Sequence, residues 1–264
     1  MKLGICTTIE NAATVASAGY DYIEPALNAV ATLDETGFEG IREQFAALAL
    51  PADAFNCFFP GSIRLTGPDV DFHSIESYLE TALTRAASLG ASIVVFGSGG
   101  SRRLPEAFPR ERGLEQVARM LAVAGPIAGE NGVTIVIEPL RSAEDNLSNT
   151  AAAGLELVEM VGHPNVRLLV DYYHMRSENE SSEIVRIAGN GMLRHCHIAR
   201  TEGRRWPKHA DGEDYTAFFA ALADIGYDGR LSVEGQTDDL ASDASAAIAF
   251  LTDATGWQSR SDPQ

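Results

Sequence analysis

Four successive apolar runs in the second half of the chain each end with a carboxylate or an imidazole. These end residues are Glu138, Asp171, His197 and Glu234. They are separated by 33, 26 and 37 residues, each about the length of one strand–helix unit. One charged residue at a strand end is usually solvated or ion-paired, whereas four in succession indicate a shared site.

At one site these residues would place three carboxylates beside an imidazole, and the carboxylates repel one another unless a cation lies between them. We therefore predict that Glu138, Asp171, His197 and Glu234 bind one divalent metal ion. Three oxygen ligands with one nitrogen suit Mn²⁺, Mg²⁺ or Co²⁺ better than a structural thiolate zinc site. Mn²⁺ is the favoured ion, with Mg²⁺, Co²⁺ and Zn²⁺ as alternatives.

Other polar and aromatic residues lie near these strand ends in the sequence. Glu144 and His174 belong to the loops that follow Glu138 and Asp171. His195 lies two residues before His197 and faces the same way one layer deeper, where a supporting role is the simpler interpretation. The loop after His197 contains a basic cluster and a candidate pair for a second metal ion: Arg200, Arg204, Arg205 and Lys208, and His209 with Asp211. Candidates for a pocket wall are Phe58, which could equally be core, Phe59 and Trp206.

The elements that must position these residues alternate between short β-rich runs and helical stretches, which predicts a parallel sheet with crossover helices. The predicted strands are Leu3–Thr7, Tyr22–Pro25, Ala54–Phe58, Ser92–Phe96, Thr134–Glu138, Arg167–Asp171, His195–Ile198 and Leu231–Glu234. The clearest predicted helices are 72–89, 114–128, 151–161, 215–225 and 243–252. Eight such units fit a single α/β domain, the (β/α)8 TIM barrel, whose reactive residues lie at the C-terminal ends of the strands.

A doubly wound open sheet is the alternative fold. It would normally have a glycine-rich loop after the first strand, where this chain has Cys6-Thr7-Thr8-Ile9-Glu10. Gly97-Ser98-Gly99-Gly100 follows the fourth strand but matches no phosphate-binding motif. This segment is either a flexible loop or part of a substrate pocket.

The composition fits one globular domain, with the barrel over residues 1–258 and a tail over 259–264 that we expect to be disordered. We expect a cytoplasmic protein without membrane contact, because the chain has no long apolar run and no signal-peptide core at its N-terminus. The net charge of −17 disfavours nucleic acid as a partner. The three cysteines, Cys6, Cys57 and Cys196, lie in apolar runs and are expected to be buried free thiols.

Several motifs together resemble a known superfamily. They are Ile137-Glu138-Pro139-Leu140, Glu144, Asn146, Asn149-Thr150, Asp171 with His174, His197-Ile198-Ala199, and Ser232-Val233-Glu234-Gly235. The set resembles the xylose isomerase-like TIM-barrel superfamily, and within it the sugar phosphate isomerase/epimerase group of ketose 3-epimerases and hydroxypyruvate isomerases. The resemblance spans nearly the whole chain and specifies the superfamily rather than one substrate.

The resemblance implies that the four strand-end residues hold the metal ion and that Glu138 and Glu234 also form an acid/base pair. It implies that Glu144, His174 and an arginine after His197 bind substrate oxygens. Arg204 is our choice for that arginine, with Arg200 and Arg205 as alternatives. Barrels of this group commonly form homodimers or homotetramers. Two loops depart from the family pattern, at Arg141-Ser142 and at 206–212, so the substrate stays open.

The implied activity is isomerisation or epimerisation of a small sugar, keto-sugar or polyol derivative, through proton abstraction next to a carbonyl and a metal-stabilised enediolate. A dehydratase acting on an inosose or a dehydroshikimate-like acid is the alternative. An apurinic-site endonuclease would need extra histidines at strands 2 to 4, where this chain has Glu24, Cys57-Phe58-Phe59 and Phe96-Gly97. A non-catalytic binding module would show a damaged ligand set, and this set is complete.

Overall fold

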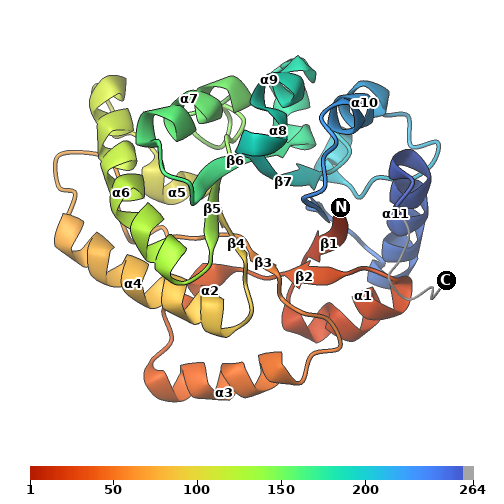
Figure 1. The fold of residues 1–264 in the computed structure, drawn as a ribbon, viewed down its shortest axis with the longest axis horizontal. Helices are drawn as coiled ribbons and strands as arrows, with labels where there is room; N and C mark the ends of the chain where they lie inside the picture. The colour runs from red at the N-terminus through yellow and green to blue at the C-terminus, as the bar shows by residue number, and fades with distance from the viewer. Residues whose placement is uncertain (258–264) are drawn as a thin grey trace.

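The computed structural model describes residues 1–257, with parallel strands at the centre and helices around them (Figure 1). The strands are β1 (Lys2–Cys6), β2 (Tyr22–Glu24), β3 (Ala54–Phe55), β4 (Ile93–Phe96), β5 (Thr134–Ile137), β6 (Val166–Asp171), β7 (Leu193–Ile198) and β8 (Arg230–Val233). The predicted tail, residues 259–264, lies outside the described residues.

The strands form one sheet in the order β2-β1-β8-β7-β6-β5-β4-β3. Every pairing within this sheet is parallel. The two outer strands meet just beyond their ends, where Ala26 pairs with Asn56 in a parallel bridge. The amide of Asn56 donates to Pro25 at 3.0 Å, and the amide of Leu27 donates to Asn56 at 2.8 Å. The sheet is therefore a nearly closed barrel, which confirms the predicted (β/α)8 fold.

Helices cover the outside of the barrel. They are α1 (Ala12–Ala18), α2 (Leu27–Ala31), α3 (Glu35–Ala46), α4 (Phe72–Ser88), α5 (Gly99–Arg102), α6 (Arg110–Glu130), α7 (Ala151–Val161), α8 (Tyr172–Ser177), α9 (Glu183–Met192), α10 (Thr216–Asp224) and α11 (Leu240–Thr255), with 3₁₀ turns η1 (Ile9–Asn11) and η2 (Glu202–Arg204). The five helices predicted most clearly correspond to α4, α6, α7, α10 and α11.

Strand side chains alternate between the barrel interior and the helical layer. One interior cluster consists of apolar residues: Tyr22, Ala54, Ile93, Val95, Val136 and Leu169. The side chains at 94, 96, 135, 137, 196, 198, 231 and 233 belong instead to the large outer core beneath the helices. The alternation therefore directs Glu138, Asp171, His197 and Glu234 inward, two residues along from interior positions.

The third strand is shorter than predicted, because it ends at Phe55 rather than at Phe58. Cys57 has a φ of 49°, a left-handed conformation that no extended strand contains. This turn brings the Cys57 side chain to the surface, whereas Cys6 is half-buried and Cys196 is buried. The prediction of three buried thiols is therefore wrong for Cys57.

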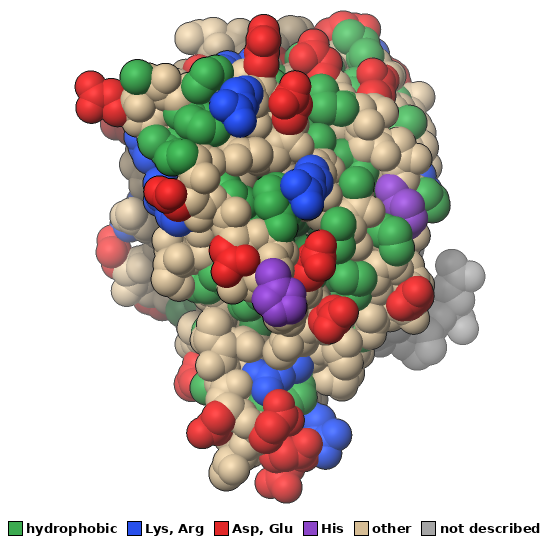
Figure 2. Space-filling model, turned by 90° about the vertical axis from the view of Figure 1, so that its left-hand side faces the viewer, with side chains coloured by type: hydrophobic (Ala, Val, Ile, Leu, Met, Phe, Trp, Pro, Cys, Tyr) green, Lys and Arg blue, Asp and Glu red, His purple; other side chains and the backbone are tan. Residues whose placement is uncertain are grey.

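The surface is consistent with the excess of acidic residues. Acidic side chains are spread over the face shown in Figure 2, among fewer basic ones. No helix within residues 1–257 is long and apolar enough to cross a membrane.

Candidate active site

The four predicted ligands meet at the C-terminal end of the barrel. Glu138 follows β5, Asp171 and His197 lie on β6 and β7, and Glu234 follows β8. One ligand atom from each of these residues lies within 4.8 Å of one ligand atom from each of the others. The structure thus brings together the set that the strand ends predicted.

His197 lies at the centre of this cluster. Its Nδ1 is 3.0 Å from Oε1 of Glu138 and 3.0 Å from Oε2 of Glu234. Its Nε2 faces the opposite way, toward Oε1 of Glu24 at 2.9 Å. Asp171 is fixed by its own backbone, because its Oδ1 accepts a hydrogen bond from the amide of Tyr173 at 2.8 Å.

The crowded charges perturb the pKa values of the cluster. Burial and the nearby charge of Glu234 raise the pKa of Glu138. Burial likewise raises the pKa of Asp171, more than the neighbouring His174 lowers it. Burial alone would raise the pKa of Glu234, but His197 and Arg204 hold it at about 2. Two nearby carboxyl groups, Glu138 and Glu234, therefore differ in their affinity for a proton.

Arg204, in η2, reaches over the cluster. Its Nη2 donates to Oε2 of Glu234 at 2.8 Å and lies 3.4 Å from Oδ2 of Asp171. Its Nη1 lies 3.6 Å from Oε2 of Glu144, and its Nη2 lies 3.4 Å from Nε2 of His174. The three side chains predicted to bind substrate, Glu144, His174 and Arg204, therefore gather at the mouth of the barrel.

The backbone of Arg204 is held in an unusual conformation, with a φ of 48°. Its carbonyl accepts a hydrogen bond from the amide of Gln236 at 2.7 Å. A Cβ at Gly235 would lie 2.6 Å from the same carbonyl, so only glycine permits this approach. The Ser-Val-Glu-Gly motif thus positions Arg204 as well as supplying Glu234.

The other candidates in the loop after β7 lie elsewhere. Arg200 pairs with Glu202 and Arg205 pairs with Asp238 at the surface. His209 is 3.2 Å from Asp253, which separates it from the four-ligand cluster. Asp211 accepts hydrogen bonds from the amides of Lys208 and Glu213 and from the hydroxyl of Tyr215. The alternative of a second metal ion at His209 and Asp211 is therefore not supported.

The cluster opens into a cleft of about 180 Å³. The cleft is lined by Asn56, Cys57, Gly97, Ser98, Gly99, Glu138, Leu140, Glu144, His174, Arg204 and Glu234. The segment Gly97-Ser98-Gly99 therefore lines the pocket, one of the two roles that the sequence left open. Phe58, Phe59 and Trp206 are buried and are not part of this lining. Phe58 lies in the core, the alternative that the sequence left open, and the prediction of a pocket wall is wrong for Phe59 and Trp206.

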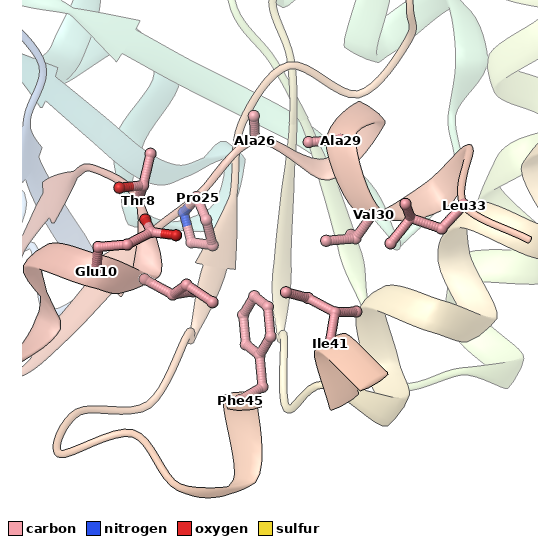
Figure 3. A pocket seen from close by; sticks show the side chains of 10 residues that line it. Thr8, Glu10, Pro25, Ala26, Ala29, Val30, Leu33, Ile41 and Phe45 are labelled. Carbon is pink, nitrogen blue, oxygen red and sulfur yellow. The ribbon is translucent and has the colours of Figure 1, made fainter. Parts of the chain in front are cut away.

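A larger hollow of about 300 Å³ lies between the loops after β1 and β2 and helix α3 (Figure 3). Its lining is mainly apolar, including Pro25, Val30, Ile41 and Phe45, with Glu10 as its one carboxylate. We place the chemistry in the smaller cleft, because that is where the buried carboxylates, the imidazoles and the guanidinium converge.

Three further residues support the position of Glu138. The Nη2 of Arg102 donates to the Glu138 carbonyl at 2.8 Å, its Nη1 donates to the Phe96 carbonyl, and its Nε pairs with Asp145 at 2.8 Å. Arg102 and Asp145 are both buried. Gly97 leaves space for the carboxylate, because a Cβ there would lie 2.0 Å from Oε2 of Glu138.

Glu24, Arg102 and Asp145 had no predicted role. Glu24 follows Tyr22-Ile23 at the end of β2, so the rule used for strands 5 to 8 would have selected it. No comparable signal marks Arg102, at the end of α5, and Asp145, in the loop after β5, which are 43 residues apart.

Fold and site together define a (β/α)8 barrel with an acidic, histidine-containing centre at its C-terminal mouth. The profile of the family described as xylose isomerase-like TIM barrel matches residues 12–254. The chain therefore belongs to this family, which confirms the resemblance.

The relatives similar to this chain in sequence include sugar epimerases and isomerases. L-ribulose 3-epimerase of Methylomonas sp. is 29% identical over 236 residues, covering 86% of this chain and 78% of the relative. L-ribulose 3-epimerase of Mesorhizobium japonicum is 30% identical over 231 residues, covering 86% and 75%. The 2-oxo-tetronate isomerase of Haemophilus influenzae is 28% identical over 231 residues, covering 83% and 84%.

Solved structures share the fold. A D-psicose 3-epimerase crystallised in the presence of D-fructose has a TM-score of 0.81 at 22% identity, covering 97% of this chain and 100% of that one. The IOLI protein with a bound zinc atom has a TM-score of 0.75 at 20% identity, covering 97% and 98%.

Proposed function

We propose that the protein is a divalent-metal-dependent isomerase or epimerase of a small keto-sugar or polyol derivative. The chain is an enzyme of the sugar isomerase and epimerase kind, as are its relatives, among them L-ribulose 3-epimerases and a 2-oxo-tetronate isomerase. The observation that carries the metal-dependent proposal is the convergence of Glu138, Asp171, His197 and Glu234 within 4.8 Å.

The donor set fits a divalent cation. Glu138, Asp171 and Glu234 lie beside a permanent cation, Arg204, and beside the ionisable ring of His197. Buried carboxylates this close need more positive charge than one guanidinium supplies. Three carboxylates and an imidazole suit Mn²⁺, Mg²⁺ or Co²⁺, and Zn²⁺ is the ion bound to one structural neighbour. When bound, the ion would act as a Lewis acid toward negative charge developing on the substrate oxygens.

The two acidic side chains Glu138 and Glu234 are proposed as the acid/base pair. They come from β5 and β8, which are separated in the sheet by β6 and β7. The pKa of Glu234, about 2, keeps it ionised and able to accept a proton from the carbon next to the carbonyl. Burial raises the pKa of Glu138, so the two carboxyl groups differ in proton affinity, as the partners of an acid/base pair do. Return of the proton to the opposite face gives epimerisation, and return to the neighbouring carbon gives isomerisation.

The side chains around the cleft would hold the substrate hydroxyls. Nδ1 of His174 accepts a hydrogen bond from the amide of Arg141 at 3.2 Å, so the ring proton lies on Nε2, which faces Asp171 and Arg204. Burial lowers the pKa of His174, so the neutral ring can donate to a substrate oxygen. Arg204 and Glu144 would supply a donor and an acceptor beside it.

Solvent deuterium exchange at the substrate carbon next to the carbonyl tests this assignment. The protein would be loaded with Mn²⁺ and assayed on a panel of L-ribulose, D-psicose, D-fructose and D-tagatose. We expect Glu138→Gln and Glu234→Gln to slow exchange by about 10²–10⁴-fold, the usual contribution of acid–base catalysis. Glu159→Gln, on the exposed side of α7, is the matched control and should exchange like the wild type.

Three outcomes would contradict the proposal. Exchange at the wild-type rate in either site variant would remove that residue from the acid/base pair. Full activity after exhaustive chelation, with metal content measured by mass spectrometry, would remove the metal ion from the mechanism. A product lighter by one water would show the dehydratase alternative instead.

A further inference from the structure

A buried polar network lies directly behind the four-residue cluster, on the strands β2, β7 and β8. Oε1 of Glu24 is 2.9 Å from Nε2 of His197. Oε2 of Glu24 is 2.8 Å from Nε2 of His195 and accepts a hydrogen bond from Oγ of Ser232 at 2.6 Å. The hydroxyl of Tyr22 lies 2.7 Å from the same Ser232 oxygen. All five side chains are fully buried.

Burial of the Glu24 carboxylate is energetically unfavourable. A carboxylate inside a barrel costs several kcal/mol of desolvation unless its oxygens are satisfied. Both oxygens of Glu24 are satisfied, and the partners that reach them are two imidazoles and one hydroxyl. Tyr22 itself needs room made by Gly4, because a Cβ at Gly4 would lie 2.3 Å from the Tyr22 ring. Gly4 on β1 thus leaves the space that the Tyr22 end of this network occupies.

The network determines which nitrogen of His197 carries a proton. An ionised carboxylate can only accept hydrogen bonds, so the Nε2 that faces Glu24 must donate. With Nε2 engaged by Glu24, Nδ1 faces the space between Glu138 and Glu234, each 3.0 Å away, and is the nitrogen that would meet a metal ion held there. An imidazole that binds a metal ion through Nδ1 carries its proton on Nε2, and this is the tautomer that the contact with Glu24 favours.

The same contacts fix the plane of the ring. His195 packs edge-on against His197, with ring centroids 4.8 Å apart and an interplanar angle of 81°. His195 is in turn held by Glu24 and by the Arg230 carbonyl, 3.2 Å from its Nδ1. Rotation of the His197 ring would therefore break its contact with Glu24 and disturb its packing with His195.

We propose that Glu24 is a positioning residue for the metal site: it holds His197 in the Nε2-protonated tautomer and in the orientation that presents Nδ1 as the metal ligand. This inference rests on the proposed function, since it assumes that the cluster binds a metal ion. Carboxylates that orient a ligating histidine in this way contribute about 10–100-fold to metal affinity in other proteins.

The experiment measures metal binding rather than turnover. Metal-free protein would be titrated with Mn²⁺ by calorimetry, with the stoichiometry checked by elemental analysis. We expect the wild type to bind one ion and Glu24→Gln to bind about 10–100-fold more weakly, because the amide cannot accept from both imidazoles and Ser232. Glu24→Asp, which keeps the charge, should recover part of the affinity. Tyr22→Phe is the control, since it removes a hydroxyl from the far end of the same network without touching Glu24.

A second measurement needs no variant and covers the case in which Glu24→Gln fails to fold. Long-range ¹H–¹⁵N spectra of wild-type protein with ¹⁵N-labelled histidine, loaded with diamagnetic Zn²⁺, should show His197 protonated at Nε2 and metal-shifted at Nδ1. The reverse pattern overturns the inference, as does equal Mn²⁺ affinity in Glu24→Gln and wild type. Binding of a second ion that disappears in Glu24→Gln overturns it as well, because Glu24, His195 and His197 would then be ligands themselves. Failure of the wild type to bind any divalent ion refutes the proposed function instead.

Discussion

The substitution Gly97→Ala tests whether the Glu138 carboxylate must occupy the position seen here. A Cβ on residue 97 would lie 2.0 Å from Oε2 of Glu138, whereas such contacts essentially never fall below 3.0 Å. The carboxylate must therefore withdraw by about 1 Å, a displacement that in enzymes costs about 10²-fold in rate. We expect kcat/KM to fall by at least this factor, which corresponds to about 2.7 kcal/mol of transition-state stabilisation.

The fold itself should tolerate the change. Gly97 does not have a positive φ, so alanine is compatible with its backbone. Gly100→Ala is the matched control, because it lies in the same glycine-rich segment and its nearest neighbour would be the Cα of Gly61 at 3.9 Å. Thermal unfolding should be similar in both variants, and Mn²⁺ affinity should fall in Gly97→Ala alone.

The assay is initial-rate epimerisation of the best ketose in the panel, together with deuterium exchange. If Gly97→Ala is as active as Gly100→Ala, the position of the Glu138 carboxylate is not critical, and the assignment of Glu138 to the acid/base pair is wrong. If both variants lose activity equally, the glycine-rich segment matters through its flexibility and not through the space it leaves for Glu138.

Three further predictions concern stability and reactivity. Burial would raise the pKa of Asp53, but hydrogen bonds from Arg230 hold it at about 2. Its folded pKa lies below its unfolded value, so its contribution of about 2 kcal/mol is present above pH 4 and is lost as pH falls toward 2. Acid titration of stability should show this slope in the wild type, and an unchanged slope in Asp53→Asn would contradict it. Asp145→Asn leaves the buried Arg102 without its counter-charge and should destabilise the protein by about 3–5 kcal/mol in urea unfolding. A loss below about 1 kcal/mol would mean that solvent reaches Arg102. Cys57 is the exposed thiol, so a thiol reagent should modify it first, more slowly with substrate bound, and Cys57→Ser should abolish this fast phase.

The convergence of Glu138, Asp171, His197 and Glu234 was predictable because two simple regularities determine it. Strand side chains alternate, and parallel strands end at the same rim of a barrel. A carboxylate that follows an apolar run by the right parity, such as Glu138 after Val136, must therefore point into the mouth. Neither step requires knowledge of which helix packs where, so the sequence was sufficient.

Other features depend on contacts that the sequence does not encode locally. The sequence predicted that β3 continues to Phe58, beyond its actual end, because Cys57 adopts a left-handed φ and no glycine signals this turn. The partnership of Glu24 with His197 joins residues 173 apart and requires β2, β1, β8 and β7 to be neighbours in that order. Arg102 finds Asp145 only when the loops after β4 and β5 are folded against each other.

The barrel mouth is asymmetric, and the asymmetry separates chemistry from specificity. Behind the ligands, β2, β7 and β8 contribute the buried polar residues Glu24, His195 and Ser232. In front, the cleft is bounded by residues that follow β3, β4 and β5, including Asn56, the small side chains of 97–99, and Leu140. Changes in the first group would disturb the imidazole and hence every reaction that the site performs. Changes in the second group alter the space available to the substrate, so we expect these residues to determine the preference among ketoses.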